Sequence, residues 1–134
     1  MNLPDRPSEL LRVALDDLRK CEADPRFKID MSQWVMPQDG VCYVCLAGSV
    51  MIQELGASPK IGCLPSHFSE EVSDKLDALN EFRMGFIDAA YESLGQELPE
   101  NLPEGIRVTR YNDDKEQFHK DMESLIKLLQ EHGE

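Results

Sequence analysis

The chain has 134 residues, the usual length of one domain, and a single core can be buried at this size without disulfide bonds or a metal. Hydrophobic residues make up 41% of the chain and charged residues 30%, a balance that excludes an intrinsically disordered protein. The net charge of −12 disfavours direct binding to nucleic acids or anionic membranes and favours basic partners.

The first forty residues predict one helix and one short strand. Apolar residues recur at helical spacing over residues 7–22, and Pro7 suits the first turn of a helix. Phe27, Ile29 and Met31 alternate with charged residues, which is typical of a half-buried strand over residues 27–31. The segment 37–40, Pro-Gln-Asp-Gly, is a turn signal.

The run over residues 41–55, VCYVCLAGSVMIQEL, is apolar on nearly every side of a helix. A helix with this pattern is surrounded by others, so we predict the central helix of the fold here. Ala47, Gly48 and Ser49 are small, which allows a neighbouring backbone to approach closely. Gly56 is a suitable stop for the helix.

The second half of the chain predicts three further helices. Ser69 is placed to cap a helix that Gly85 ends or kinks, and a short helix over residues 87–94 follows. Ile106 and Val108 are candidates to pair as a strand with residues 27–31. Asp113 with Glu116 three residues on, ahead of an apolar stripe, predicts the last helix.

These elements predict a mainly α fold in one domain over residues 1–134. About five helices pack around the central apolar helix 41–55, with at most one small two-stranded sheet.

The N-terminus lacks the basic start and apolar stretch of a secretory signal, and no apolar run approaches the about 20 residues that span a bilayer. We therefore expect a cytoplasmic protein. In a reducing compartment the four cysteines are expected to be free thiols or metal ligands rather than disulfides.

Cys42, Cys45, Cys63 and His67 offer four ligands of the kind that hold a structural zinc ion. Against this hypothesis, Cys42 and Cys45 fall in an apolar run, where cysteine behaves as a small hydrophobe. We therefore expect no cofactor, with zinc as the alternative.

A catalytic role is the weaker hypothesis. The C-x-x-C pair lacks the strand and helix context of a redox protein, and no motif fixes a nucleophile beside His67 or His119. The paired acids 70–71 and 113–114 fall where helix N-termini favour negative charge, so capping explains them. We expect a protein that is not an enzyme.

Two stretches carry a resemblance to a known family. Trp34 is followed by CYVCLAGSVM at residues 42–51, and LNEFRMG occupies residues 79–85. They resemble short proteins of tailed bacteriophages and prophages whose pattern runs from a tryptophan through C-x-V-C-L-A-G-(A/S)-V-M to A-L-N-x-F-R-x-G. The likeness covers roughly residues 8–95 and implies a phage-derived accessory protein in the bacterial cytoplasm.

The family has no assigned activity, so the resemblance transfers no functional residues. Cys63 and His67 lie outside the pattern, which favours helix packing over zinc.

The charge distribution gives the leading functional hypothesis. Residues 1–40 carry eight acids and six bases, residues 41–68 one of each, and residues 69–134 seventeen acids and seven bases. An acidic second half favours binding to a basic host protein, with a nucleic-acid-binding protein as one candidate, although the charge can also serve solubility alone. Homodimerisation stays open. The residues that we expect to carry the binding are Glu70, Glu71, Asp74, Asp77, Glu81, Asp113, Asp114 and Glu116.

Overall fold

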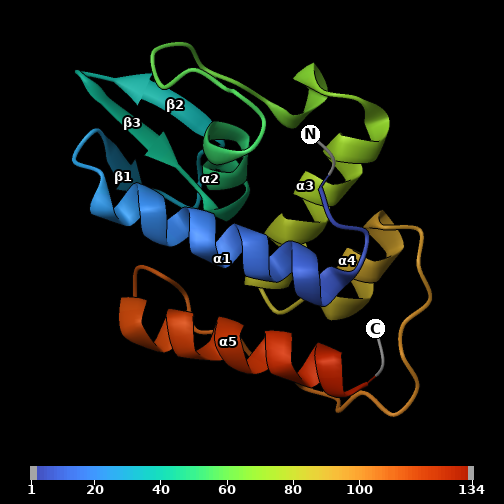
Figure 1. Ribbon diagram of the computed structural model, residues 1–134. Coiled ribbons are helices and arrows are strands. Elements are labelled where there is room, and N and C mark those ends of the chain that lie inside the picture. Colours follow the sequence, from blue (N-terminus) through green and yellow to red (C-terminus); the bar gives the residue numbers. More distant parts are fainter. Residues whose placement is uncertain (1–2, 133–134) are drawn as a thin grey trace.

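The computed structural model describes residues 3–132 and shows an α+β arrangement (Figure 1). A small sheet lies at one end of the molecule, and helices make up the rest. The elements in chain order are α1 (Pro7–Ala23), β1 (Phe27–Ile29), β2 (Val35–Gln38), β3 (Val41–Val44), α2 (Leu46–Gln53), a 3-10 turn (Pro65–His67), α3 (Glu70–Arg83), α4 (Ile87–Ser93) and α5 (Lys115–Glu131).

The sheet corrects the predicted mainly α fold. Its three strands run in the order β1-β3-β2, with β1 parallel and β2 antiparallel to β3. The predicted limit of two strands is wrong, and so is the pairing of Ile106 and Val108 with residues 27–31, because β3 occupies that position and residues 106–110 form no strand.

The predicted central helix 41–55 is wrong in its first part. Asp39 and Gly40 have φ values of 53° and 80°, the positive pair that a tight hairpin turn requires, so the chain reverses there and Val41 enters β3. The helix begins only at Leu46, because the Cys45 Sγ accepts a hydrogen bond from the Gly48 backbone N–H at 3.2 Å and caps α2.

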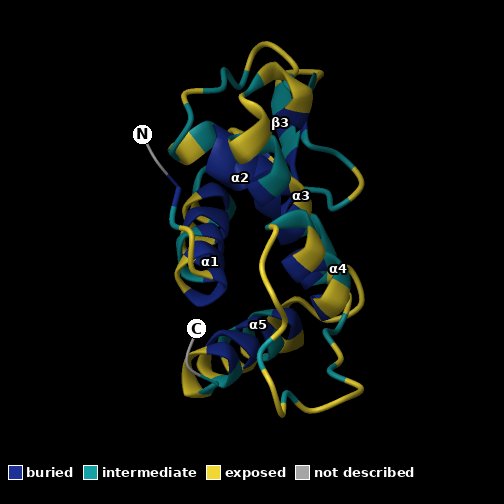
Figure 2. Ribbon diagram, turned by 90° about the vertical axis from the view of Figure 1, so that its right-hand side faces the viewer, coloured by how far each residue is buried: buried dark blue, intermediate teal, exposed yellow. Residues whose placement is uncertain are grey.

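The core lies between α1, α2, the sheet and α3. Helix α2 is buried through most of its length, and α1 presents its apolar stripe to it (Figure 2). The predicted close approach at the small residues is confirmed: a Cβ added to Gly48 would lie 1.8 Å from the backbone oxygen of Trp34. The segment before β2 therefore packs directly on the α2 backbone.

The remaining helices agree with the sequence prediction apart from one cap. The Ser69 hydroxyl accepts from the Val72 N–H and starts α3, and Gly85, with φ of 82°, follows its end. Helix α5 lies along α1 and buries its predicted stripe, but its N-cap is Asp114 rather than Asp113. Among the described residues, no helix is both long and apolar enough to cross a membrane.

Candidate functional site

The eight carboxylates expected to bind a partner fall into two separate groups. Five lie on α3, at Glu70, Glu71, Asp74, Asp77 and Glu81, and the other three, Asp113, Asp114 and Glu116, surround the start of α5. The start of α5 lies at the opposite end of the molecule from α4 and the segment that follows it (Figure 1). The structure therefore does not bring the two groups into one face.

The group at the start of α5 lies among basic residues. Residues 107–120 contain three acids and four Lys or Arg residues. The Asp114 Oδ1 accepts from the Gln117 backbone N–H at 3.1 Å, so this carboxylate serves as the helix cap. Such a mixture of charges produces a weak net field, which makes this group the poorer candidate.

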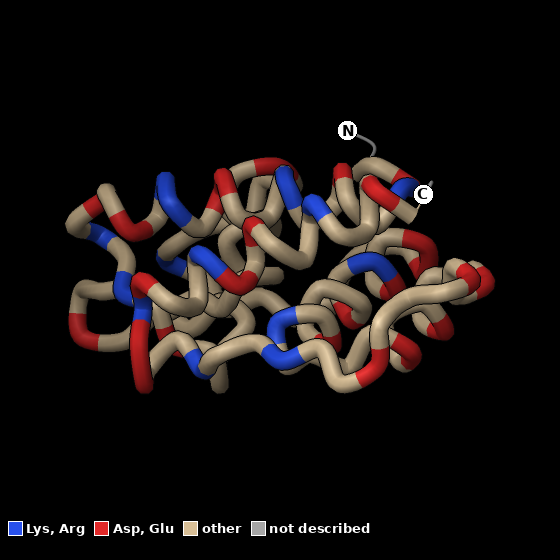
Figure 3. Tube along the Cα trace, turned by 90° about the horizontal axis from the view of Figure 1, so that it is seen from below, with Lys and Arg blue, Asp and Glu red and all other residues tan. Residues whose placement is uncertain are grey.

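A larger set of carboxylates gathers around the start of α3, α4 and the segment 94–106. Residues 84–106 contain five acids and no Lys or Arg, a signal that was present in the sequence and that the predicted site omitted. Acidic segments, drawn red, predominate at the right-hand end of Figure 3, whereas acidic and basic segments, red and blue, alternate at the left-hand end. We call this region the acidic end and define it by nine residues: Asp5, Glu70, Glu71, Asp74, Asp88, Glu92, Glu97, Glu100 and Glu104.

Lys75 holds one part of the acidic end together. Its ammonium group lies 2.8 Å from the Asp5 carboxylate and 3.4 Å from that of Glu71, and it donates to the Leu3 backbone oxygen at 2.8 Å. The side chain of Lys75 is only 8% exposed. In the described part of the chain, it is the one basic residue among those lining a cleft of about 300 Å³ beside Asp74 and Glu92. Its charge is already paired, so it leaves most of the surrounding carboxylates without a basic partner.

An apolar cleft adjoins these carboxylates. It lies between the start of α4 and residues 98–106 and has a volume of about 730 Å³. Phe86 and Leu98 line it and are 55% and 42% exposed, and Leu102 and Ile106 lie deeper. Asp88 and Glu104 also line the cleft. No sequence pattern indicates this cleft, because residues 94–106 contain no regular element whose pattern would mark a buried side.

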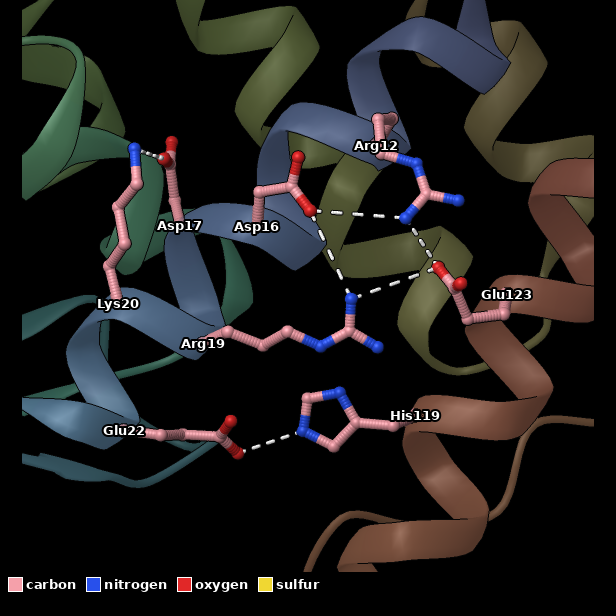
Figure 4. Close-up of polar contacts among 8 residues, drawn as sticks. All are labelled: Arg12, Asp16, Asp17, Arg19, Lys20, Glu22, His119 and Glu123. Carbon is pink, nitrogen blue, oxygen red and sulfur yellow. Dashed lines mark hydrogen bonds and ion pairs between the residues drawn. The ribbon is translucent and has the colours of Figure 1, made fainter.

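A different set of polar contacts joins α1 to α5 (Figure 4). The Glu22 carboxylate accepts a hydrogen bond from the Tyr111 hydroxyl at 2.5 Å and lies 2.9 Å from the His119 Nε2. Burial, together with this contact to Glu22, raises the pKa of Tyr111. Nearer the middle of α1, Arg12 and Arg19 both reach Glu123 of α5. His119 is thus a partly buried interhelical contact, and these groups serve to dock α5 on α1.

The predicted zinc ligands are not brought together as a site. Cys42 lies on the buried side of β3, Cys45 caps α2, and the His67 Nδ1 accepts from the Leu64 backbone N–H at 3.2 Å. Among residues 3–132, no group of three or more His, Cys, Asp or Glu side chains could hold a metal ion. The geometry therefore does not support the zinc alternative.

The cysteines also lack the character of nucleophiles. Cys21, Cys42 and Cys45 are buried, and burial raises the pKa of each thiol as well as that of the partly exposed Cys63. A raised pKa lowers the fraction of thiolate, which is the reactive form.

The residues of the phage-like pattern meet around the loop that leads into β2. Arg83 donates from Nη2 to the Met31 backbone oxygen and from Nε to the Asn80 Oδ1, both at 2.9 Å. Together with Trp34 and Cys45 they line a small hollow of about 150 Å³. The pattern thus joins α2, α3 and this loop, which is a structural task.

No protein-family model matches the chain, and the searches of curated proteins and of solved structures gave no significant match.

Proposed function

We propose that this protein is a non-enzymatic binding protein that presents its acidic end to a basic host protein in the bacterial cytoplasm, as an accessory protein of phage or prophage origin. The observation that carries the proposal is the run of residues 84–106, with five acids and no Lys or Arg, beside the carboxylates at the start of α3. A surface of one charge sign steers an oppositely charged partner and repels nucleic acids and anionic lipids.

Of the eight carboxylates expected to bind a partner, the proposed surface keeps those on the part of α3 that faces α4 and the segment 94–106. Glu71 and Asp74 line the same cleft as Glu92, so they belong to one surface. Asp113, Asp114 and Glu116 are set aside because neighbouring basic residues balance their charge.

Two triple variants with equal changes in net charge test the proposal. Both replace exposed carboxylates by the neutral amide of the same shape, so the folded chain should be preserved. The acidic-end variant carries Glu92→Gln, Glu97→Gln and Glu100→Gln. The mixed-charge control carries Asp39→Asn, in the β2–β3 turn where Lys60 lines the same hollow, and Asp113→Asn and Glu116→Gln at the start of α5.

Each tagged protein is used to capture partners from a bacterial lysate at low and high salt, with quantitative mass spectrometry of the retained proteins. We expect the unmodified chain and the mixed-charge control to retain the same basic protein at low salt and to release it at high salt, because salt screens exposed charges beyond a Debye length of about 10 Å at 0.1 M. The acidic-end variant should lose it. Equal retention by both variants, or a captured protein that is not basic, would contradict the proposal.

A further inference from the structure

The apolar cleft beside α4 exposes two large hydrophobic residues. Phe86, at the start of α4, and Leu98, in the segment that follows α4, both line it, and each is more than a third exposed. Its volume of about 730 Å³ falls within the range of about 300–1,000 Å³ that is typical of sites that bury a ligand. The cleft is thus large enough to receive apolar side chains from a partner.

Backbone contacts hold the Phe86 side of the cleft and the Ile106 end of the other wall. The Phe86 N–H donates to the Glu81 oxygen at 3.0 Å and the Gly85 N–H to the Phe82 oxygen at 2.9 Å, a C-terminal cap that sets the position of Phe86. On the other wall, a Cβ on Gly85 would come within 3.2 Å of the Ile106 oxygen, so residues 106–108 lie directly on the end of α3. These parts of the cleft are therefore held in place without a partner, which reduces the entropy lost on binding.

The charge around the cleft selects its occupant. Asp88 and Glu104 are among its lining residues, no Lys or Arg of the described chain lines it, and Glu100 lies in the same segment. An anionic ligand would be repelled. A second copy of this chain would bring two acidic ends together, which is also unfavourable. A cationic segment with apolar side chains satisfies both the charge and the cleft.

We propose that the apolar cleft, lined by Phe86, Leu98, Leu102 and Ile106, takes apolar anchor side chains of a basic protein segment whose flanking Lys or Arg residues pair with Asp88, Glu104 and their acidic neighbours. This inference rests on the proposed function and adds to it the kind of segment that is recognised. The cleft supplies affinity through burial, and the carboxylates supply steering and selection against other ligands.

The test uses two fluorescein-labelled synthetic peptides that differ in one respect. One carries lysines flanking a pair of leucines, and the other carries serines in place of the leucines. Affinities for the full chain are measured by fluorescence anisotropy at low salt. The cleft variant carries Phe86→Ala and Leu98→Ala, and its matched control carries Met36→Ala and Ile61→Ala, because both of these residues are exposed apolar side chains outside the cleft. Circular dichroism verifies that each variant is folded.

We expect the leucine peptide to bind the unmodified chain about tenfold more tightly than the serine peptide, since one anchored side chain contributes on that order. The cleft variant should lose this difference, whereas its control should keep it. The acidic-end variant should weaken the binding of both peptides alike.

Three results would overturn the inference, and they separate it from the proposed function. If both peptides bind equally well and only the acidic-end variant weakens them, the cleft has no role but the acidic end remains a binding surface. If neither peptide binds, both proposals fail. If sedimentation shows a dimer that the cleft variant converts to a monomer, a second copy occupies the cleft.

Discussion

Among the described residues, Asp17 on α1 has the carboxyl group whose pKa is shifted most. The residue is 1% exposed, one carboxylate oxygen has no hydrogen-bond partner, and its other oxygen lies 3.7 Å from the Lys20 ammonium. Burial, followed by the neighbouring Glu54 carboxyl, raises the pKa of Asp17 to about 7. The folded chain therefore binds a proton at this position at pH values where the unfolded chain has already released it.

This pKa predicts that stability falls as the pH rises. Between the unfolded value of 3.8 and about 7, the folded state holds the proton more tightly, so the free energy of unfolding decreases over that range. Above about 7 the folded chain contains a buried, ionised carboxylate. Asp17→Asn removes the ionisation. The change in the free energy of unfolding that it causes should be more stabilising at pH 8 than at pH 5, by roughly 2–4 kcal/mol.

Urea unfolding of the unmodified chain and of Asp17→Asn at both pH values measures this difference. Asp16→Asn is the control, because Asp16 directly precedes Asp17 on α1 but is exposed. If Asp17→Asn changes stability equally at pH 5 and pH 8, the raised pKa is wrong.

Gly48 is the second residue at which a small change should have a large effect. A Cβ at this position would overlap the Trp34 backbone oxygen, and a backbone atom cannot move aside as a flexible side chain can. In an open helix, Gly→Ala stabilises by about 1 kcal/mol, so the direction expected here is the reverse of the helix propensity. Gly48→Ala should destabilise by more than about 2 kcal/mol through overpacking.

Chemical denaturation gives the size of the loss, and Gly95→Ala supplies the comparison. Gly95 has a φ of 65° with no atom near the position of a Cβ, so alanine there meets backbone strain but no clash. A loss at Gly48 that is no larger than the loss at Gly95 would mean that Trp34 and α2 are not in such close contact.

At the scale of whole elements, α5 depends on α1 for its position. Glu22 and Glu123 are both acceptors in this interface, but the Glu22 side chain is 11% exposed and that of Glu123 is 42% exposed. Removal of a buried acceptor leaves its donors without partners, whereas an exposed ion pair contributes little. Glu22→Ala should therefore destabilise by about 1–3 kcal/mol, and Glu123→Ala by less than about 1 kcal/mol.

The two substitutions are compared by thermal unfolding and by hydrogen exchange of the α5 amides. Glu22→Ala should increase exchange throughout α5, because the Tyr111 hydroxyl and the His119 ring both lose their contact with α1. Equal effects of the two substitutions would show that burial of Glu22 does not contribute to docking.

The sequence predicted the elements whose burial is one-sided. Helix α1 matches the predicted range 7–22 to within a residue, and the α5 stripe from Phe118 to Leu129 is buried as predicted. The run 41–55 failed because both a buried strand and a buried helix are apolar on all sides, so periodicity cannot separate them. The turn at Asp39 and Gly40 and the cap at Cys45 decided the outcome, and cysteine is an uncommon helix cap.

Only part of the candidate site could be predicted, because the sequence gives local patterns but not the packing of one element on another. The acids on α3 could be read from the sequence, since five of them occupy one predicted helix. Their grouping with Glu92 and with the segment 94–106 depends on how α4 packs against α3, and no local pattern gives that packing. The balance of charge at Asp113, in contrast, could be predicted from the sequence by counting the Lys and Arg residues of the segment 107–120 with its acids.

At the scale of the whole molecule, net charge and its uneven placement should cost stability at low salt. Like charges repel across the folded surface, and the net charge of −12 is concentrated in the second half of the chain. Carboxylates at the acidic end have few basic neighbours to offset this repulsion, whereas those around the start of α5 lie among Arg and Lys residues. Neutralising the first set should therefore stabilise the fold more than neutralising the second.

The acidic-end variant and the mixed-charge control measure this difference directly, because both change the net charge by the same amount. In thermal unfolding at about 20 mM NaCl, we expect the acidic-end variant to have the higher melting temperature of the two, and at about 300 mM NaCl we expect the difference to shrink as salt screens the repulsion. Equal melting temperatures at low salt would mean that the acidic end is not a region of unbalanced charge. If the difference is found, carboxylates at the acidic end repel one another in the folded chain, and a basic partner would relieve that repulsion. Neutralising them should then raise stability and weaken binding together.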